Sequence, residues 1–271
     1  MITMFASSWL FVPGDRPDRF GKACSSGAGA VILDLEDAVA PASKAEARAA
    51  VRKFLDLPRD ASRPAIAVRM NPVSTLAGLH DLAMLVELGD RLDYLIVPKA
   101  EEAAELALIG KMLAPTIDHP SIIALIESGR GVAMASQLAV ASPQMAALMF
   151  GAADYAADLG KSVARYRPDF ARTTIVNAAA AGGIAALDSP WFDTKDASGL
   201  AEECAASMAL GFHAKAAIHP SQIDEINRAF SVSDADRDLA RRYIAASVEG
   251  VALVDGKMVD VAMLNWARRI A

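Results

Sequence analysis

Charged side chains follow most of the apolar runs in this sequence, at the points where buried strands would end. In chain order these residues are Asp34, Glu36, Asp37, Arg69, Lys99, Glu127, Asp154 and Asp188. Each comes after a run that would hold it rigidly. Because the carboxyl ends of parallel strands meet at one edge, we expect these charges to converge. So many carboxylates on one rim would repel each other unless a cation lay among them.

The ligand types indicate which cation this would be. Carboxylate oxygens without a His or Cys cluster favour Mg²⁺ or Mn²⁺ over zinc. Mg²⁺ takes one or two protein carboxylates and keeps its other positions for water and substrate. Glu127 and Asp154, on consecutive strands, could supply that pair. The alternative is that Glu127 is an ion-paired barrel residue and that Asp154 caps the helix after Gly151.

Two cationic residues end neighbouring runs. Arg69 presents a planar guanidinium that suits bidentate carboxylate binding, and the alternative is a structural pair with Asp34 or Glu36. Lys99 could form a Schiff base, which needs a lowered lysine pKa. Neighbouring carboxylates would raise that pKa instead. We therefore expect a structural or electrostatic role for Lys99.

A basic loop follows the first run. Arg16, Arg19 and Lys22 lie near the start of an expected helix. A local basic patch in an otherwise acidic protein suits a phosphate-bearing ligand. The alternative is a solvated helix face that pairs with Asp15 and Asp18.

The elements that carry these residues alternate along the chain. The apolar runs, rich in Val, Ile, Leu and Ala, span residues 9–13, 30–37, 65–72, 94–99, 122–128, 146–151, 184–189 and 214–220. They lack polar alternation, which is typical of strands buried on both faces of a parallel sheet. Helical segments are expected at 43–55, 76–88, 100–113, 129–139, 173–181 and 199–210. Ser43 and Glu46 have the spacing of a capping box at the first of these.

Eight such repeats predict a TIM-type (β/α)₈ barrel over residues 1–233. A doubly wound sheet is the rival, but no G-x-G-x-x-G turn follows the first run. Residues 234–271 are expected to form an extension with a helix at 234–248, a hairpin-like piece at 250–260 and a last helix at 262–270. We expect this extension to pack on the barrel or on a neighbouring subunit.

Composition excludes several classes of protein. The chain has 271 residues, 54% hydrophobic, with a net charge of −6, which argues against dominant disorder and against a nucleic-acid or anionic-membrane surface. The only cysteines, Cys24 and Cys204, lack metal-ligand spacing, so a reducing compartment is expected. With no secretory signal and no apolar run long enough for a bilayer, the sequence predicts a cytoplasmic protein.

Eight motifs, taken in order, resemble the citrate lyase beta-subunit-like family, which includes malyl-CoA, methylmalyl-CoA and citramalyl-CoA lyases. They are SWLFVPGDRP at 8–17, VILDLEDAV at 31–39, VRMNP at 68–72, IVPKAE at 96–101, ALIES at 124–128, FGAADYAADLG at 150–160, AIHPSQ at 217–222 and GKMVD at 256–260. Each motif alone is weakly specific, but their shared order is strong. The resemblance runs from the first strand to the tail.

The resemblance implies a barrel enzyme that makes or breaks a carbon–carbon bond beside an acyl-CoA thioester, with Mg²⁺. By the same resemblance Glu127 and Asp154 bind the metal, which chelates the keto-acid part of the substrate, so Glu127 also counts as substrate-binding. Arg69 contacts substrate oxygens. The resemblance also implies that Glu36 and Asp37 hold metal-bound water, and that Arg16, Arg19 and Lys22 lie near the CoA phosphates.

Family members with a full tail carry an Asp that matches Asp260. It reaches a neighbouring subunit's site and moves the proton at the acetyl carbon. One departure bears on this role, because the family often has Pro two residues later, where this chain has Ala262. The family precedent is a homotrimer or hexamer.

The sequence therefore predicts a Mg²⁺-dependent lyase of a 3-hydroxyacyl-CoA such as malyl-CoA, citramalyl-CoA or citryl-CoA. It would yield acetyl-CoA or a related acyl-CoA and a 2-oxo acid. Three alternatives remain: a citryl-carrier-protein lyase subunit of a citrate lyase complex, a malyl-CoA thioesterase, and a barrel that serves only as a scaffold. The cluster of charged residues argues against the last, because a scaffold gains little from it.

Overall fold

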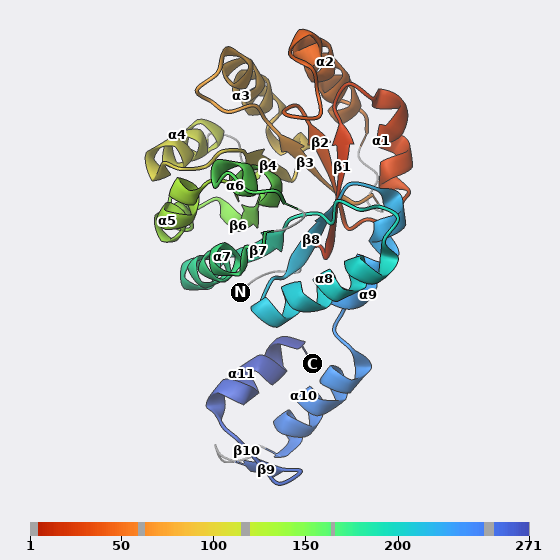
Figure 1. The fold of residues 1–271 in the computed structure, drawn as a ribbon, viewed down its shortest axis with the longest axis vertical. Coiled ribbons are helices and arrows are strands. Elements are labelled where there is room, and N and C mark those ends of the chain that lie inside the picture. The colour runs from red at the N-terminus through yellow and green to blue at the C-terminus, as the bar shows by residue number, and fades with distance from the viewer. Residues whose placement is uncertain (1–4, 59–62, 115–119, 164–165, 247–251, 271) are drawn as a thin grey trace. The chain divides into compact units, whose positions relative to one another are not determined.

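The computed structural model describes residues 5–58, 63–114, 120–163, 166–246 and 252–270. Eight parallel strands close into a barrel in chain order, with β1 paired to both β2 and β8 (Figure 1). The strands are β1 Ser8–Pro13, β2 Ala30–Asp34, β3 Ala65–Arg69, β4 Tyr94–Val97, β5 Ser121–Ile126, β6 Met145–Phe150, β7 Ala185–Asp188 and β8 Ala214–Ala217. The predicted barrel is confirmed, and the doubly wound sheet is excluded because the sheet has no free edge.

Side chains alternate between the barrel interior and the helix-facing surface. Trp9, Ile32 and Leu125 belong to an interior cluster, which is otherwise rich in alanine. The Trp9 ring packs edge-on against the ring of Tyr94, with the two ring centres 5.0 Å apart. The intervening residues pack outward against the helices. Burial on both faces explains why these strands show no polar alternation in the sequence.

Helices surround the barrel (Figure 1). Those of the barrel unit are α1 Pro17–Cys24, α2 Lys44–Leu55, α3 Leu76–Leu88, α4 Ala103–Leu113, α5 Gly129–Leu138, α6 Ala152–Asp158, α7 Asp169–Gly182, α8 Ala197–Leu210 and α9 Ile223–Phe230. The capping box expected at Ser43 is wrong. Ser43 belongs to a 3₁₀ turn, Pro41–Ser43, its φ and ψ are helical, and its side chain makes no capping hydrogen bond. A capping residue needs extended backbone, which that turn does not give it.

Contacts along the chain divide it into two units, Met1–Phe230 and Ser231–Ala271. The second contains α10 Asp234–Ala246, β9 Ala252–Val254, β10 Lys257–Val259 and α11 Val261–Ile270. Asp255 and Gly256 between its strands both have positive φ, 51° and 75°, as a tight hairpin turn requires. Its own small core includes Tyr243, Val259 and Leu264. The expected helix–hairpin–helix order is present, and positions 247–251 lie outside the described residues.

Among the described residues, no helix is both long enough and apolar enough to cross a membrane.

Candidate functional site

The alternation inside the barrel brings three charged side chains to the carboxyl end of the sheet. Ile32 and Ala67 face inward, so Asp34 and Arg69, two residues further along, do so as well. Asp34 and Arg69 are also paired in register between β2 and β3. By the same count Glu127 follows the inward-facing Leu125, just beyond the end of β5. This is the end of a barrel where catalytic residues gather.

Arg69 is held on several sides. Its Nε and Nη2 donate to the two carboxylate oxygens of Asp34, at 2.7 and 2.6 Å. Its Nη1 lies 3.2 Å from Glu36 Oε2, and its guanidinium stacks 4.9 Å from the ring centre of Phe11. Burial works against the charged form, but Asp34 and Glu36 outweigh it and raise the Arg69 pKa. The forked edge of Arg69 therefore binds Asp34, which leaves Nη1 as its remaining edge.

Glu127 is a buried carboxylate, only 4% exposed. Burial, followed by the nearby charge of Glu36, raises its pKa to about 8, and Asp154 adds to the effect. Its Oε1 accepts a hydrogen bond from the backbone N–H of Lys99 at 2.7 Å. Lys99 has a left-handed backbone with φ of 51°, a conformation that costs a non-glycine residue energy and is common at functional sites.

Lys99 bridges the carboxylates. Its Nζ lies 2.8 Å from Glu36 Oε1 and 4.0 Å from Glu127 Oε1. Burial works against its charge, but the bond to Glu36 and the carboxylates around it raise the Lys99 pKa to about 12. An ammonium group so stabilised is a poor Schiff-base nucleophile. The structure thus agrees with the electrostatic role expected from the sequence.

Asp154 and Asp37 complete the acidic side of the site. Asp154 is half-buried in the first turn of α6, close enough to raise the pKa of Glu127. Asp37 is exposed on the loop after β2. Burial raises the pKa of Glu36, and the charge of Asp37 adds to the shift. We call Glu36, Asp37, Glu127 and Asp154 the acidic cluster.

The acidic cluster fits a hard divalent cation. Burial, followed by neighbouring carboxylate charge, raises the pKa values of Glu127 and Glu36, so a cation among these side chains would stabilise their charged forms, and all the donor atoms are oxygens. Gly151 leaves room for this arrangement, since a Cβ there would lie 2.9 Å from Glu127 Oε2. Over the residues that the structure describes, no three His, Cys, Asp or Glu side chains form a ready-made metal cage. Mg²⁺ takes one or two protein carboxylates and keeps several water ligands.

The predicted CoA-binding residues lie after β1, at the same end of the barrel. Arg16, Arg19 and Lys22 are all exposed, on or just before α1. Arg16 donates to both carboxylate oxygens of Asp18 at 3.0 Å, as the solvated-face alternative expected. Arg16, Arg19 and Lys22 remain candidates for a phosphate-bearing ligand.

Asp260 belongs to the second unit, Ser231–Ala271. It precedes α11 and caps it, because its Oδ1 accepts a hydrogen bond from the Met263 N–H at 3.0 Å. Asp260 is half-buried within its unit.

Asp188 does not join the rim, which corrects the expectation from the sequence. Leu187 is the inward residue of β7, so Asp188 faces the helices. Its Oδ2 accepts from Arg172 Nη2 at 2.7 Å and from Lys215 Nζ at 3.0 Å, and the Ser207 hydroxyl also donates to it. Asp188 is thus part of a buried ionic network between the barrel and α7 and α8.

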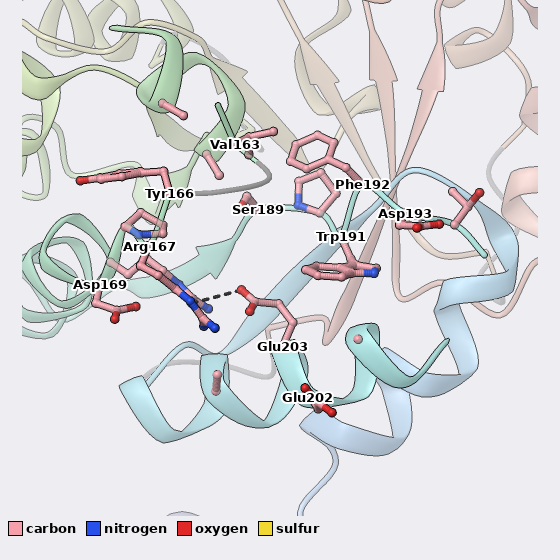
Figure 2. Close-up of a pocket in the computed structure, with 18 of the residues that line it drawn as sticks. Val163, Tyr166, Arg167, Asp169, Ser189, Trp191, Phe192, Asp193, Glu202 and Glu203 are labelled. Atoms are coloured by element: carbon pink, nitrogen blue, oxygen red, sulfur yellow. Dashed lines mark ion pairs between the residues drawn. The ribbon is translucent and has the colours of Figure 1, made fainter. Parts of the chain in front are cut away.

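A cavity of about 970 Å³ opens beside the starts of α7 and α8 (Figure 2). Its lining includes Tyr166, Arg167, Arg172, Trp191, Phe192 and Glu203. The dashed line in Figure 2 is the ion pair between Arg172 Nη1 and Glu203 Oε1, at 3.1 Å. No residue of the acidic cluster lines this cavity, and its mixed charges select no ligand class. The charges of the acidic cluster locate the candidate site better than cavity size does.

Sequence reasoning gave no role to Phe11 and Gly151. Phe11 supports the Arg69 guanidinium, and its position two residues after the inward Trp9 could have indicated this. Gly151 has no side chain beside Glu127, and nothing in the sequence marked it.

Known proteins resemble this chain over nearly its whole length. The family described as HpcH/HpaI aldolase/citrate lyase matches residues 7–220. A citrate lyase subunit beta-like protein of Mycobacterium tuberculosis is 41% identical, over 96% of this chain and 92% of the relative. An L-malyl-CoA/beta-methylmalyl-CoA lyase of Cereibacter sphaeroides is 33% identical over 96% of this chain and 92% of its own length. A (3S)-malyl-CoA thioesterase of the same species is 35% identical over 97% and 92%.

A solved structure shares the fold. The protein CitE of Mycobacterium tuberculosis, in complex with magnesium, acetoacetate and coenzyme A, superimposes with a TM-score of 0.80 at 39% identity. The match covers 98% of this chain and 97% of that one.

Proposed function

This chain belongs to the HpcH/HpaI aldolase/citrate lyase family, and from that premise we propose that it is a Mg²⁺-dependent lyase of a 3-hydroxyacyl-CoA. Membership makes the chain an enzyme of the carbon–carbon lyase type. The observation that supports the proposal most is the buried Glu127 carboxylate, raised to a pKa of about 8 among Glu36 and Asp154. Malyl-CoA, citramalyl-CoA and citryl-CoA are the candidate substrates.

Glu127 and Asp154 would hold the Mg²⁺ ion. When bound, the ion supplies Lewis-acid polarisation of the substrate hydroxyl and of the 2-oxo acid that forms. Glu36 and Asp37 would orient water beside it. Lys99 balances part of the negative charge of the acidic cluster, through its bond to Glu36.

Arg69 would bind one substrate oxygen through Nη1. Asp34 occupies its fork, so bidentate binding of a substrate carboxylate would require that pair to open. A single fixed donor suits an oxygen on which charge develops during bond cleavage, the thioester carbonyl of the departing enolate. Arg19, Lys22 and Arg16 would bind the CoA phosphates.

Asp260 would return the proton to the acetyl carbon. Cleavage breaks the bond between the two substrate carbons while the substrate hydroxyl becomes the carbonyl of the 2-oxo acid, and its proton would pass to water beside Glu36 and Asp37. The electron pair of the broken bond stays on the enolate carbon, which must be protonated. In the direction of synthesis the same carboxylate removes that proton. We place Asp260 in the site of a neighbouring subunit, with residues 234–271 as the extension that delivers it, in a homotrimer or hexamer. The free thiols of Cys24 and Cys204 support a reducing, cytoplasmic location.

The thioesterase is the second candidate, since a relative bears that name. In that reaction water attacks the thioester and releases free CoA and the hydroxy acid. A carrier-protein thioester in place of CoA is a third candidate, and Mn²⁺ is the alternative metal.

The deciding experiment measures products from the three thioesters with Mg²⁺, with Mn²⁺ and with EDTA. We expect glyoxylate, pyruvate or oxaloacetate, respectively, together with acetyl-CoA, and only when metal is present. Free CoA with malate and no 2-oxo acid would instead support the thioesterase. A folded protein that releases neither product from any of the three would refute the CoA-lyase proposal.

A further inference from the structure

A buried polar cluster ties the loop after β2 to the loop after β3. The Leu35 carbonyl accepts a hydrogen bond from Asn71 Nδ2 at 2.8 Å and another from Lys44 Nζ at 2.7 Å. Lys44 Nζ also donates to the Glu36 carbonyl, at 2.6 Å. Asn71 is only 5% exposed, so its bond to the Leu35 carbonyl is made out of water, where it is strong and holds a fixed geometry.

Asp81 holds Asn71 in place. It lies on α3, and its side chain is fully buried. Its Oδ2 accepts from both the backbone N–H and the Nδ2 of Asn71, at 2.8 and 2.6 Å. Its Oδ1 accepts from Arg48 Nη1 of α2 at 3.0 Å. We call Lys44, Asn71 and Asp81, around the Leu35 carbonyl, the Leu35 clamp.

The close packing of α3 against the loop keeps Asp81 in reach. A Cβ at Gly78 would lie 2.1 Å from the Pro72 carbonyl oxygen, so only glycine lets α3 approach so near. A carboxylate buried in this way is costly unless it is fully paired. Nothing in the proposed chemistry uses Asp81 directly, which raises the question of what this buried carboxylate does.

The Leu35 clamp acts on the residue between the two carboxylates that hold Arg69. Leu35 lies between Asp34 and Glu36, and its N–H donates to the Arg69 carbonyl at 2.9 Å. The Glu36 N–H in turn donates to Asp34 Oδ1 at 2.9 Å. A rotation of the Leu35 peptide would therefore turn both carboxylates away from the Arg69 guanidinium.

We propose that Asp81 is a positioning residue, which fixes the direction of the Arg69 guanidinium through Asn71 and the Leu35 carbonyl. Asp81 touches neither substrate nor metal. It orients Asn71, Asn71 holds the Leu35 peptide, and that peptide sets Asp34 and Glu36 against Arg69. The effect on catalysis rests on the proposed function, whereas the effect on the Arg69 hydrogen bond does not.

The test compares Asn71→Ala and Asp81→Ala with the matched control Arg52→Gln. Arg52 of α2 pairs with Glu87 of α3 at 2.7 Å, so the control removes an ion pair between the same two helices without touching Asn71. The first readout is hydrogen exchange of the Arg69 Nε–H in ¹⁵N-arginine-labelled protein, assigned by its loss in Arg69→Lys. We expect slow exchange in the wild type and the control, and about tenfold faster exchange or more in both clamp variants.

The second readout is steady-state kinetics on the thioester that the wild type cleaves. We expect kcat to fall by about ten- to a hundredfold in the clamp variants, with KM changed less, since Arg69 is misplaced rather than removed. Melting temperatures show that each variant is folded, and Asn71→Ala decides the matter if Asp81→Ala does not fold. Folded clamp variants with unchanged Nε–H exchange and the kcat of the control would overturn the proposal. A wild type inactive on every thioester would refute the proposed function, while the exchange readout would still test the Leu35 clamp.

Discussion

Gly151 offers a clean test of the metal site, because alanine there meets Glu127 and little else. The φ of Gly151 is −107°, outside the left-handed region, so alanine brings no backbone strain of that kind. Its Cβ would lie 2.7 Å from Glu127 Cβ and 2.9 Å from Glu127 Oε2. The third neighbour, Leu125 Cδ1, is 3.2 Å away.

The size of the effect follows from these distances. Carbon atoms pack at about 3.5 Å, so Glu127 must move by about 0.8 Å to admit the methyl group. A displacement near 1 Å in an active site costs about a hundredfold in rate, which corresponds to about 2.7 kcal/mol of activation free energy. We therefore expect Gly151→Ala to lower kcat/KM about a hundredfold and to weaken Mg²⁺ binding. Overpacking should cost about 1–3 kcal/mol of the free energy of unfolding.

Isothermal titration measures the Mg²⁺ affinity and steady-state kinetics measures kcat/KM. Urea unfolding measures the free energy of unfolding. Gly129→Ala is the matched control, since a Cβ there has its nearest neighbours at 3.5 and 4.0 Å. A folded Gly151→Ala protein with wild-type Mg²⁺ affinity and kcat/KM would refute the assignment of Glu127.

Other predictions address the buried ionic network of Asp188, the thiol of Cys204 and the amine of Lys99. Asp188→Ala leaves Lys215 and Arg172 buried without their shared carboxylate, and should lower the free energy of unfolding by about 3–5 kcal/mol in urea; a loss below about 1 kcal/mol would contradict this. Burial opposes ionisation of Asp188, but Lys215 and Arg172 outweigh it and lower the Asp188 pKa. The stabilising effect of the ionised carboxylate is therefore present above the ordinary Asp pKa of about 3.9 and is lost as pH falls through the lowered value. The free energies of unfolding of the wild type and Asp188→Asn, measured across acid pH, should converge at that lowered pKa. Burial raises the pKa of Cys204 to about 11, so iodoacetamide at pH 8 should leave Cys204 unmodified by mass spectrometry until the chain is unfolded; rapid labelling of the folded chain would count against the buried thiol. Borohydride added with pyruvate should trap no adduct on Lys99, whose pKa of about 12 keeps it protonated, and a reduced imine at that residue would restore the Schiff-base mechanism.

The barrel could be predicted from the sequence because its signal is repeated eight times. Each apolar run is fixed by burial on both faces, and an error in one run would not change the fold. The residues of the candidate site are harder to predict than the barrel, because residue type alone does not say which face of a strand a side chain lies on. Asp188 and Glu127 both follow apolar runs, yet one faces the helices and the other lies at the mouth of the barrel. The inward-facing Leu125 and Leu187 separate them, because Glu127 lies two residues after Leu125 and Asp188 lies one residue after Leu187.

Other features had no sequence signal to find. Asn71 and Asp81 are joined only through the packing of α3 on the loop after β3, and ten residues separate them in the chain. Ser43 matches a capping motif, but it belongs to the 3₁₀ turn before α2, which gives its backbone a helical conformation. Local motifs fail where tertiary packing decides the conformation.

The pairing of β1 with β8 sets the order in which the chain can fold. Ser8 pairs with Lys215, so the last ladder joins segments that are 215 − 8 = 207 residues apart. During synthesis β1 must wait, with one edge unpaired, until β8 has left the ribosome. Such an edge invites pairing with other chains, and contacts so distant form slowly. A chain cut before Ala214 would keep that edge open, and we expect it to associate with other chains rather than persist as a smaller barrel.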